Sequence, residues 1–242
     1  MNNEQKVYYG KYGNIGHCSI GTSIPRLIDY PAYYKAEIAR RKDRNNPELS
    51  QKVKELNAHA YDYAIANQKF KKLEVLPDSL WVSNDNLEVP KDSDNVFSII
   101  NGGIVFRENV VNIFNQLRLG QTTLTPVKIH IIETGELWSD ETFYFFNLCE
   151  QREYVCMSQP NNSLKTMITE KDKLVFTGSV KNSELLEVSK SALDCDVDIW
   201  HDPRYLSSIF MSDELYHALL DANLVKARDG ISVWFMNICT LV

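Results

Sequence analysis

The chain has 242 residues, of which 44% are hydrophobic and 24% are charged. This balance is ordinary for a globular protein with its own core and disfavours intrinsic disorder and membrane spans. The formal net charge of −6 opposes binding to a nucleic-acid phosphate backbone and is compatible with a basic protein partner. The N-terminus lacks the basic-then-apolar order of a signal peptide, so the sequence predicts a cytoplasmic protein that binds no membrane.

The first part of the chain changes from a glycine-rich start to a helical pattern. Glycines among tyrosines predict turns that link short strands. Further on, Asn46 is a candidate N-cap and Pro47 suits the first helical turn. One amphipathic helix to about Lys72 is predicted by apolar residues spaced three and four apart, namely Leu49, Val53, Leu56, Ala60 and Tyr63. We therefore expect residues 1–75 to form an N-terminal helical extension packed on a main domain of residues 76–242.

The main domain contains a pattern that occurs twice, near Ser98–Ile132 and near Tyr205–Leu241. Each copy has a short apolar stretch, a polar helix start, an apolar-periodic helix and a second strand-like run. Strands are also predicted between the copies, at Thr142–Cys149, Tyr154–Met157, Leu174–Thr177 and Leu185–Val188. Since strands outnumber helices, the sequence predicts an α+β fold with a mixed or largely antiparallel sheet, packed helices and a duplicated strand-helix-strand unit.

The densest cluster of acidic residues runs from Asp194 to Asp202. It lacks the glycine and glutamate that a calcium-binding EF-hand loop requires, so the calcium interpretation fails. In a strand, the period of two would place alternate aspartates on one face. That face is either a solvated acidic edge or a surface that docks on a basic partner, since aromatic anchors beside charge are typical of interface hot spots. The candidate partner-binding residues are Asp194, Asp196, Asp198, Trp200, Asp202 and Tyr205.

No catalytic or metal site is predicted. The five histidines show no His-x-x-x-His spacing, and the five cysteines show no Cys-x-x-Cys pair. Neither a Gly-x-Ser-x-Gly elbow nor a Gly-Lys-Ser/Thr phosphate loop occurs in the sequence. We therefore expect a protein that is not an enzyme and uses no cofactor or metal.

The main domain resembles a bacterial family first catalogued as a domain of unknown function and later assigned to the immunity proteins of polymorphic toxin systems. Its members tend to end in the pattern strand, Ser-Asp/Glu, helix, Ala-x-Leu, glycine, strand. The resemblance covers about residues 76–242 and supplies no catalytic residue. It is carried by Ile104–Glu108 and Pro126–Ile132 in the first copy, and by Asp198–Tyr205, Ile209–Leu215 and Ala218–Leu224 in the second.

The resemblance implies an immunity protein that binds a cognate antibacterial toxin, delivered by type VI or contact-dependent secretion, and neutralises it by stoichiometric occlusion. Nuclease toxins are often basic, and an acidic surface would then speed encounter and fix register. Two alternatives stay open. One is an adaptor that loads an effector by binding its delivery region. The other is a small-ligand-binding or enzymatic α+β domain with a site among Tyr8, Tyr9, Tyr12, His17 and Phe143–Phe146.

Overall fold

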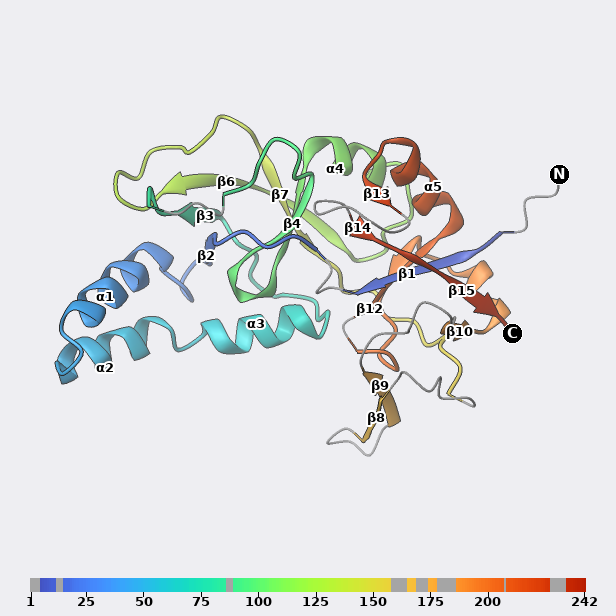
Figure 1. Cartoon of the computed structure of the whole chain (residues 1–242), viewed down its shortest axis with the longest axis horizontal. Helices are drawn as coiled ribbons and strands as arrows, with labels where there is room; N and C mark the ends of the chain where they lie inside the picture. Colours follow the sequence, from blue (N-terminus) through green and yellow to red (C-terminus); the bar gives the residue numbers. More distant parts are fainter. Residues whose placement is uncertain are drawn as a thin grey trace. The chain divides into compact units, whose positions relative to one another are not determined.

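The computed structural model of the chain describes residues 5–11, 15–85, 89–157, 165–168, 174–177, 186–206, 208–226 and 234–242. It divides into two compact units. The central unit consists of His17–Glu108 and Thr123–Asn147, and the terminal unit consists of Met1–Gly16, Asn109–Thr122 and Leu148–Val242. Each unit contains both helices and strands, which confirms the predicted α+β fold (Figure 1).

A six-stranded sheet organises the central unit, in the order β2-β3-β6-β7-β5-β4. Its strands are β2 (Gly21–Ser23), β3 (Ser79–Val82), β4 (Val96–Ser98), β5 (Ile104–Arg107), β6 (Thr123–Ile131) and β7 (Phe143–Asn147). Strands β3 and β6 run parallel, and the other neighbouring pairs are antiparallel. The sheet is therefore mixed and largely antiparallel, as predicted, and its buried core includes Leu80, Val105, Ile129, Phe143 and Phe145.

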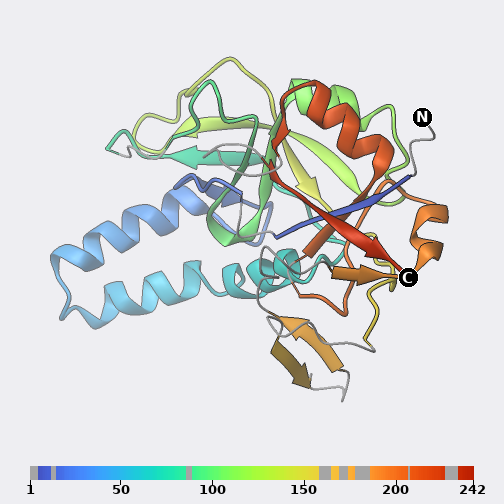
Figure 2. The ribbon, with the colours of Figure 1, turned by 45° about the vertical axis from the view of Figure 1, so that its right-hand side comes forward.

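The helices of the central unit are α1 (Tyr30–Lys42), α2 (Pro47–Leu56), α3 (Ala60–Gln68) and the short 3₁₀ helix η2 (Ile100–Gly102). Asn46 caps α2 as predicted, because its side chain accepts hydrogen bonds from two N–H groups of the first turn. The single helix predicted to about Lys72 is wrong: a turn at residues 57–59 separates α2 from α3. Helices α1 and α2 lie side by side as a hairpin (Figure 2).

Tyr30 fixes the start of α1 against strand β2. A Cβ atom at Gly21 would overlap the ring carbons of Tyr30, so the ring occupies the space of the missing side chain. The Tyr30 N–H also donates to Ser23 Oγ at 3.1 Å. Glycine inside a strand commonly marks such a close approach. This contact holds Asp29, the N-cap of α1, beside the edge of the sheet.

A five-stranded sheet organises the terminal unit, in the order β10-β15-β1-β12-β11. Its strands are β1 (Val7–Lys11), β10 (Leu186–Val188), β11 (Ile199–Trp200), β12 (Ser208–Ser212) and β15 (Asn237–Leu241). Among the described residues of this sheet, only β10 and β15 pair in parallel. The helices of the unit are α4 (Glu108–Phe114), whose first residue belongs to the central unit, α5 (Asp213–Asp221) and the 3₁₀ helix η3 (Lys190–Asp194). Two further pairs of strands complete it, β8 (Lys165–Ile168) with β9 (Leu174–Thr177) and β13 (Val225–Lys226) with β14 (Trp234–Phe235).

The duplicated strand-helix-strand unit is not confirmed. In both copies a strand leads directly into a helix, β5 into α4 and β12 into α5. The closing strands differ, because β6 lies between β3 and β7 in the large sheet whereas β13 pairs with β14 in a two-stranded sheet. Residues 231–233 of the predicted second closing strand lie outside the described residues.

The compact units do not follow the boundary predicted near residue 75. Strand β1 pairs with β12 and β15, so the first strand belongs to the terminal unit. The helices α1 to α3 belong instead to the central unit, where Tyr30, Ala60 and Tyr63 share a core with strand residues. Backbone pairing and burial, rather than proximity along the chain, determine this division.

Candidate functional site

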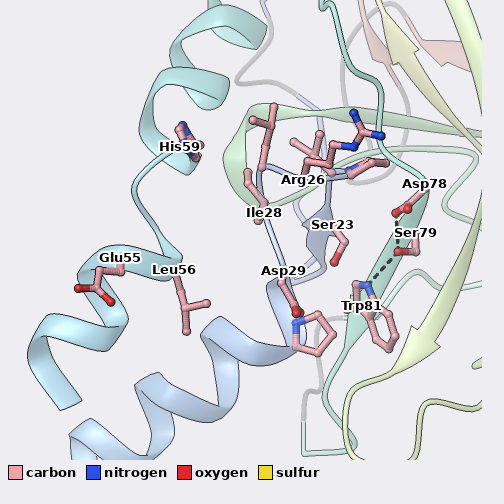
Figure 3. A pocket seen from close by; sticks show the side chains of 14 residues that line it. Ser23, Arg26, Ile28, Asp29, Glu55, Leu56, His59, Asp78, Ser79 and Trp81 are labelled. Carbon is pink, nitrogen blue, oxygen red and sulfur yellow. Dashed lines mark hydrogen bonds between the residues drawn. The ribbon is translucent and has the colours of Figure 1, made fainter. Parts of the chain in front are cut away.

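A groove of about 600 Å³ opens on the central unit. It is formed by the loop from Ser23 to Asp29, the corner between α2 and α3, and the first residues of β3. Figure 3 shows Glu55, Leu56 and His59 on the helical corner opposite the loop and strand, with the Glu55 carboxylate directed away from them. Apolar side chains line its floor, with Ile28 buried and Leu56 half-buried.

A tight turn with an unusual residue forms one wall of the groove. Leu27 N–H donates to Ile24 O at 3.0 Å, and the backbone groups of Ile24 and Ile28 bond each other at 2.9 and 3.0 Å. Pro25 is the second residue of this turn, and Arg26, the third, has a left-handed backbone with φ of 67°. This pattern is that of a type II turn, whose third position normally holds glycine or asparagine.

Local packing does not account for Arg26. Three other non-glycine residues in the described part of the chain have a left-handed backbone, namely Phe70, Asn101 and Asn223. Asparagine tolerates this conformation, and Phe70 is buried in the core, which offsets the steric cost. Arg26 is exposed, and it has no hydrogen bond or ion pair to another described side chain. The turn therefore carries an unpaired guanidinium at the groove.

Three carboxylates surround the groove. Asp29 caps α1 by accepting from Ala32 N–H at 3.0 Å, Glu55 accepts from Gln51 Nε2 at 2.8 Å, and Asp78 accepts from the Ser79 hydroxyl at 2.8 Å. All three residues are exposed. These hydrogen bonds orient the carboxylates without neutralising them, so with Arg26 the groove residues carry an excess of negative charge.

Trp81 provides the large aromatic surface of the groove. It is half-buried in β3 and packs against His130 of the neighbouring strand β6, with ring centroids 5.0 Å apart and a tilt of 31° between the rings. Its Nε1–H donates to Ser79 Oγ at 3.1 Å, and that hydroxyl in turn donates to Asp78 (Figure 3). The indole is therefore oriented by one ring contact and one hydrogen bond, while part of its surface stays open to the groove.

The predicted partner-binding residues lie in the terminal unit, and the structure separates them. Asp194 ends the 3₁₀ helix η3 and is exposed. Asp196 is also exposed but forms a two-pronged ion pair with Arg152, at 2.8 and 2.9 Å. Bends, not a strand, follow Asp194, so the expected acidic face of alternating aspartates is wrong. The physical reason is that Asp196 and Asp198 bond arginines distant in sequence, Arg152 and Arg118, instead of lining one strand face.

Asp198 is buried, with 1% of its side chain accessible. Its carboxylate accepts from the Arg118 guanidinium at 2.8 and 3.1 Å and from the Arg118 backbone N–H at 2.8 Å. Burial alone would raise the pKa of this carboxyl, but the Arg118 hydrogen bonds outweigh it and lower the pKa below its usual value. Asp198 therefore anchors the loop before β6 to strand β11, and its carboxylate is not open to a partner.

Trp200 and Asp202 are fully buried as well. Trp200 stacks on Phe210 with a 14° angle between the rings. Asp202 accepts from the N–H groups of Tyr154 and Val155, both at 2.6 Å, and of Arg204 at 2.9 Å. Burial raises the pKa of the Asp202 carboxyl. These contacts join two segments of the terminal unit and give both residues a structural role.

Tyr205, the last of the six, is buried beneath Lys11. The Lys11 ammonium lies 3.3 Å from the centre of the Tyr205 ring and donates to the Leu206 carbonyl. Burial lowers the pKa of Lys11 to about 7. Nearby, the ring of His201 bonds Ser208 O at 2.8 Å, and burial lowers the pKa of His201 to about 4. Of the six predicted residues, only Asp194 and Asp196 are therefore exposed.

The aromatic residues proposed for a ligand site do not form one cluster. Tyr8 and Tyr9 belong to the terminal unit, whereas His17 and Phe143–Phe146 belong to the central unit. Tyr9, Phe143 and Phe145 are buried in the cores of their units. Tyr12 lies outside the described residues.

Sequence reasoning missed the groove residues. Neither Trp81 nor Arg26 is among the candidate residues that the sequence predicts. A usable signal was present, because proline followed by a charged residue between two isoleucines, at Ile24–Ile28, is typical of a turn. The convergence of that turn with Glu55 and Asp78, which are distant in sequence, had no such signal.

The chain matches no protein-family model, and a search of curated proteins finds no match either. Within the described ranges, no helix is both long and apolar enough to cross a membrane. The same residues include no group of three or more histidine, cysteine, aspartate or glutamate side chains placed to hold a metal ion.

Proposed function

We propose that this protein is a cytoplasmic immunity protein that binds a cognate antibacterial toxin domain and blocks it by stoichiometric occlusion. The toxin would be delivered by type VI or contact-dependent secretion. The resemblance over about residues 76–242 supports this assignment. An inhibitor of this kind needs a complementary surface rather than catalysis, a cofactor, nucleic acid or a membrane.

The groove of the central unit is the structural observation that favours a protein partner. Its apolar floor is bordered by exposed charged side chains, as in Asp29, Glu55 and Asp78. Protein interfaces commonly combine an apolar centre with a polar rim. A surface of this composition suits a partner that covers the centre and pairs with the rim.

The size of the groove favours a second candidate, a small-ligand-binding protein. Its volume of about 600 Å³ falls within the roughly 300–1,000 Å³ common for ligand pockets. Such pockets bury about 70–90% of the ligand surface. The exposure of the rim residues favours a macromolecule, because a small ligand lying between them would remain open to water.

Co-expression tests the proposal. The toxin domain encoded beside this chain is expressed in a bacterium, alone and together with the chain, and growth and co-purification are scored. Immunity predicts rescued growth and a stable complex of fixed stoichiometry. Continued killing without co-purification, by a toxin that is active alone, contradicts it. An adaptor would instead co-purify with the delivery region of the effector and leave toxicity unchanged.

A further inference from the structure

We infer that the groove of the central unit is the surface on which the toxin docks, and that the toxin segment filling it carries lysine or arginine beside apolar side chains. This inference rests on the proposed function. It moves the interface from the predicted acidic stretch of the terminal unit, where four of the six candidate residues are buried, to a different set of residues.

The negative charge of the residues that line the groove indicates a basic occupant. Asp29 and Asp78 lie on the loop and strand side of the groove, and Glu55 lines it from α2 (Figure 3). One guanidinium, that of Arg26, opposes these three carboxylates, so the lining has an excess of negative charge. A cationic segment would meet the carboxylates among the lining residues, and complementary charge both speeds encounter and fixes register.

The apolar floor and Trp81 identify the rest of the occupant. Tryptophan is enriched among interface residues that contribute most to binding, and its face attracts cations. Here the indole is held by His130 and Ser79 while part of it faces the groove. Ile28 and Leu56 add aliphatic surface. A segment that alternates basic and apolar side chains satisfies both parts of the lining.

Arg26 places one positive charge in the otherwise acidic lining of the groove. Its guanidinium has no partner within the described part of the chain, and its left-handed backbone holds it at the turn. A partner with a carboxylate at the matching position gains an ion pair there. A purely basic partner meets a like charge instead, which disfavours wrong partners.

Two triple variants with the same loss of charge test the inference. The groove variant combines Asp29→Asn, Glu55→Gln and Asp78→Asn. Asparagine is as good an N-cap as aspartate, and each amide oxygen can still accept the hydrogen bond of the carboxylate it replaces. The control variant combines Glu74→Gln, Asp92→Asn and Glu136→Gln, which are exposed in the same unit and do not line the groove.

Association and dissociation rates are measured by biolayer interferometry against the full toxin domain, inactivated at its own active site, at two salt concentrations. Three exposed ion pairs predict that the groove variant weakens Kd about three- to a hundredfold. It should also lose most of the salt dependence of association, whereas the control variant should bind like the wild type.

The outcomes are distinct. Equal binding by all three proteins overturns the docking inference while the proposed function stands. Binding by none of them, including the wild type, contradicts the proposed function and the inference with it. Circular dichroism and melting verify the fold. If the groove triple melts earlier than the control, its three single variants are measured instead, and their Kd ratios must multiply to a loss of about threefold or more.

Discussion

Replacing Arg26 by glycine should stabilise the protein. At φ of 67°, an L-residue with a Cβ atom pays a steric cost that glycine avoids. That cost is about 1–2 kcal/mol. Glycine loses about 0.5–1 kcal/mol through the greater freedom of the unfolded chain. Because Arg26 forms no bond in the described part of the chain that the substitution would break, the net gain in unfolding free energy lies between zero and about 1.5 kcal/mol.

The matched control is Arg44→Gly. Arg44 is also an exposed arginine of the central unit, but it is not among the residues with a left-handed backbone. There only the entropic cost of glycine remains, so Arg44→Gly should destabilise the protein by about 0.5–1 kcal/mol. Urea denaturation followed by tryptophan fluorescence measures both variants, provided that the m-values agree.

A loss of stability in Arg26→Gly as large as that in Arg44→Gly would refute the reasoning. It would mean that the guanidinium contributes a stabilising contact or that the turn has another conformation. If Arg26→Gly is more stable than the wild type, the wild-type protein retains a residue at the groove that lowers its stability. Such backbone strain is expected where it serves binding. The same variant should then bind the toxin less selectively.

Three further substitutions test the contacts described above. Asp202→Asn can keep an amide oxygen toward the N–H groups of Tyr154 and Val155, but its NH₂ group then faces the Arg204 N–H, which should cost about 1–3 kcal/mol by urea denaturation; a cost near zero contradicts the structural role of this carboxylate. Because the pKa of His201 is about 4 in the folded protein and about 6.5 in the unfolded chain, the folded state binds fewer protons, and stability should fall by up to about 3 kcal/mol between pH 6.5 and 4. His201→Asn should remove that part of the pH dependence, and an unchanged profile would show that this side chain is not its source. Gly21→Ala forces a Cβ into the Tyr30 ring and should cost about 1–3 kcal/mol, measured by thermal melting; an unaltered melting temperature would mean that α1 shifts freely.

The fold class was predictable because it depends on local patterns. Asn46 and Pro47 marked the start of α2 correctly, and the apolar run near Phe143 became strand β7. The break between α2 and α3 was missed because apolar residues keep their helical spacing through the turn at residues 57–59. The division into units was missed because β1 pairs with strands near the other end of the chain, and pairing at that distance leaves no local pattern.

The candidate site was less predictable for a physical reason. In the stretch from Asp194 to Asp202, alternating aspartates resemble an exposed strand, but the arginine and backbone donors that bury Asp198 and Asp202 come from elsewhere in the chain. Those partners decide whether a carboxylate is buried, and they are brought in by the tertiary fold. The groove likewise exists only after the loop at Arg26, the helical corner and β3 have come together.

The most direct test is to titrate the purified, active toxin domain with this protein and measure the remaining toxin activity. Stoichiometric occlusion predicts that activity falls linearly and is abolished at a fixed molar ratio, and that the groove triple requires a much higher concentration than the control triple. Full toxin activity at a large molar excess of the wild-type protein would contradict the proposed function.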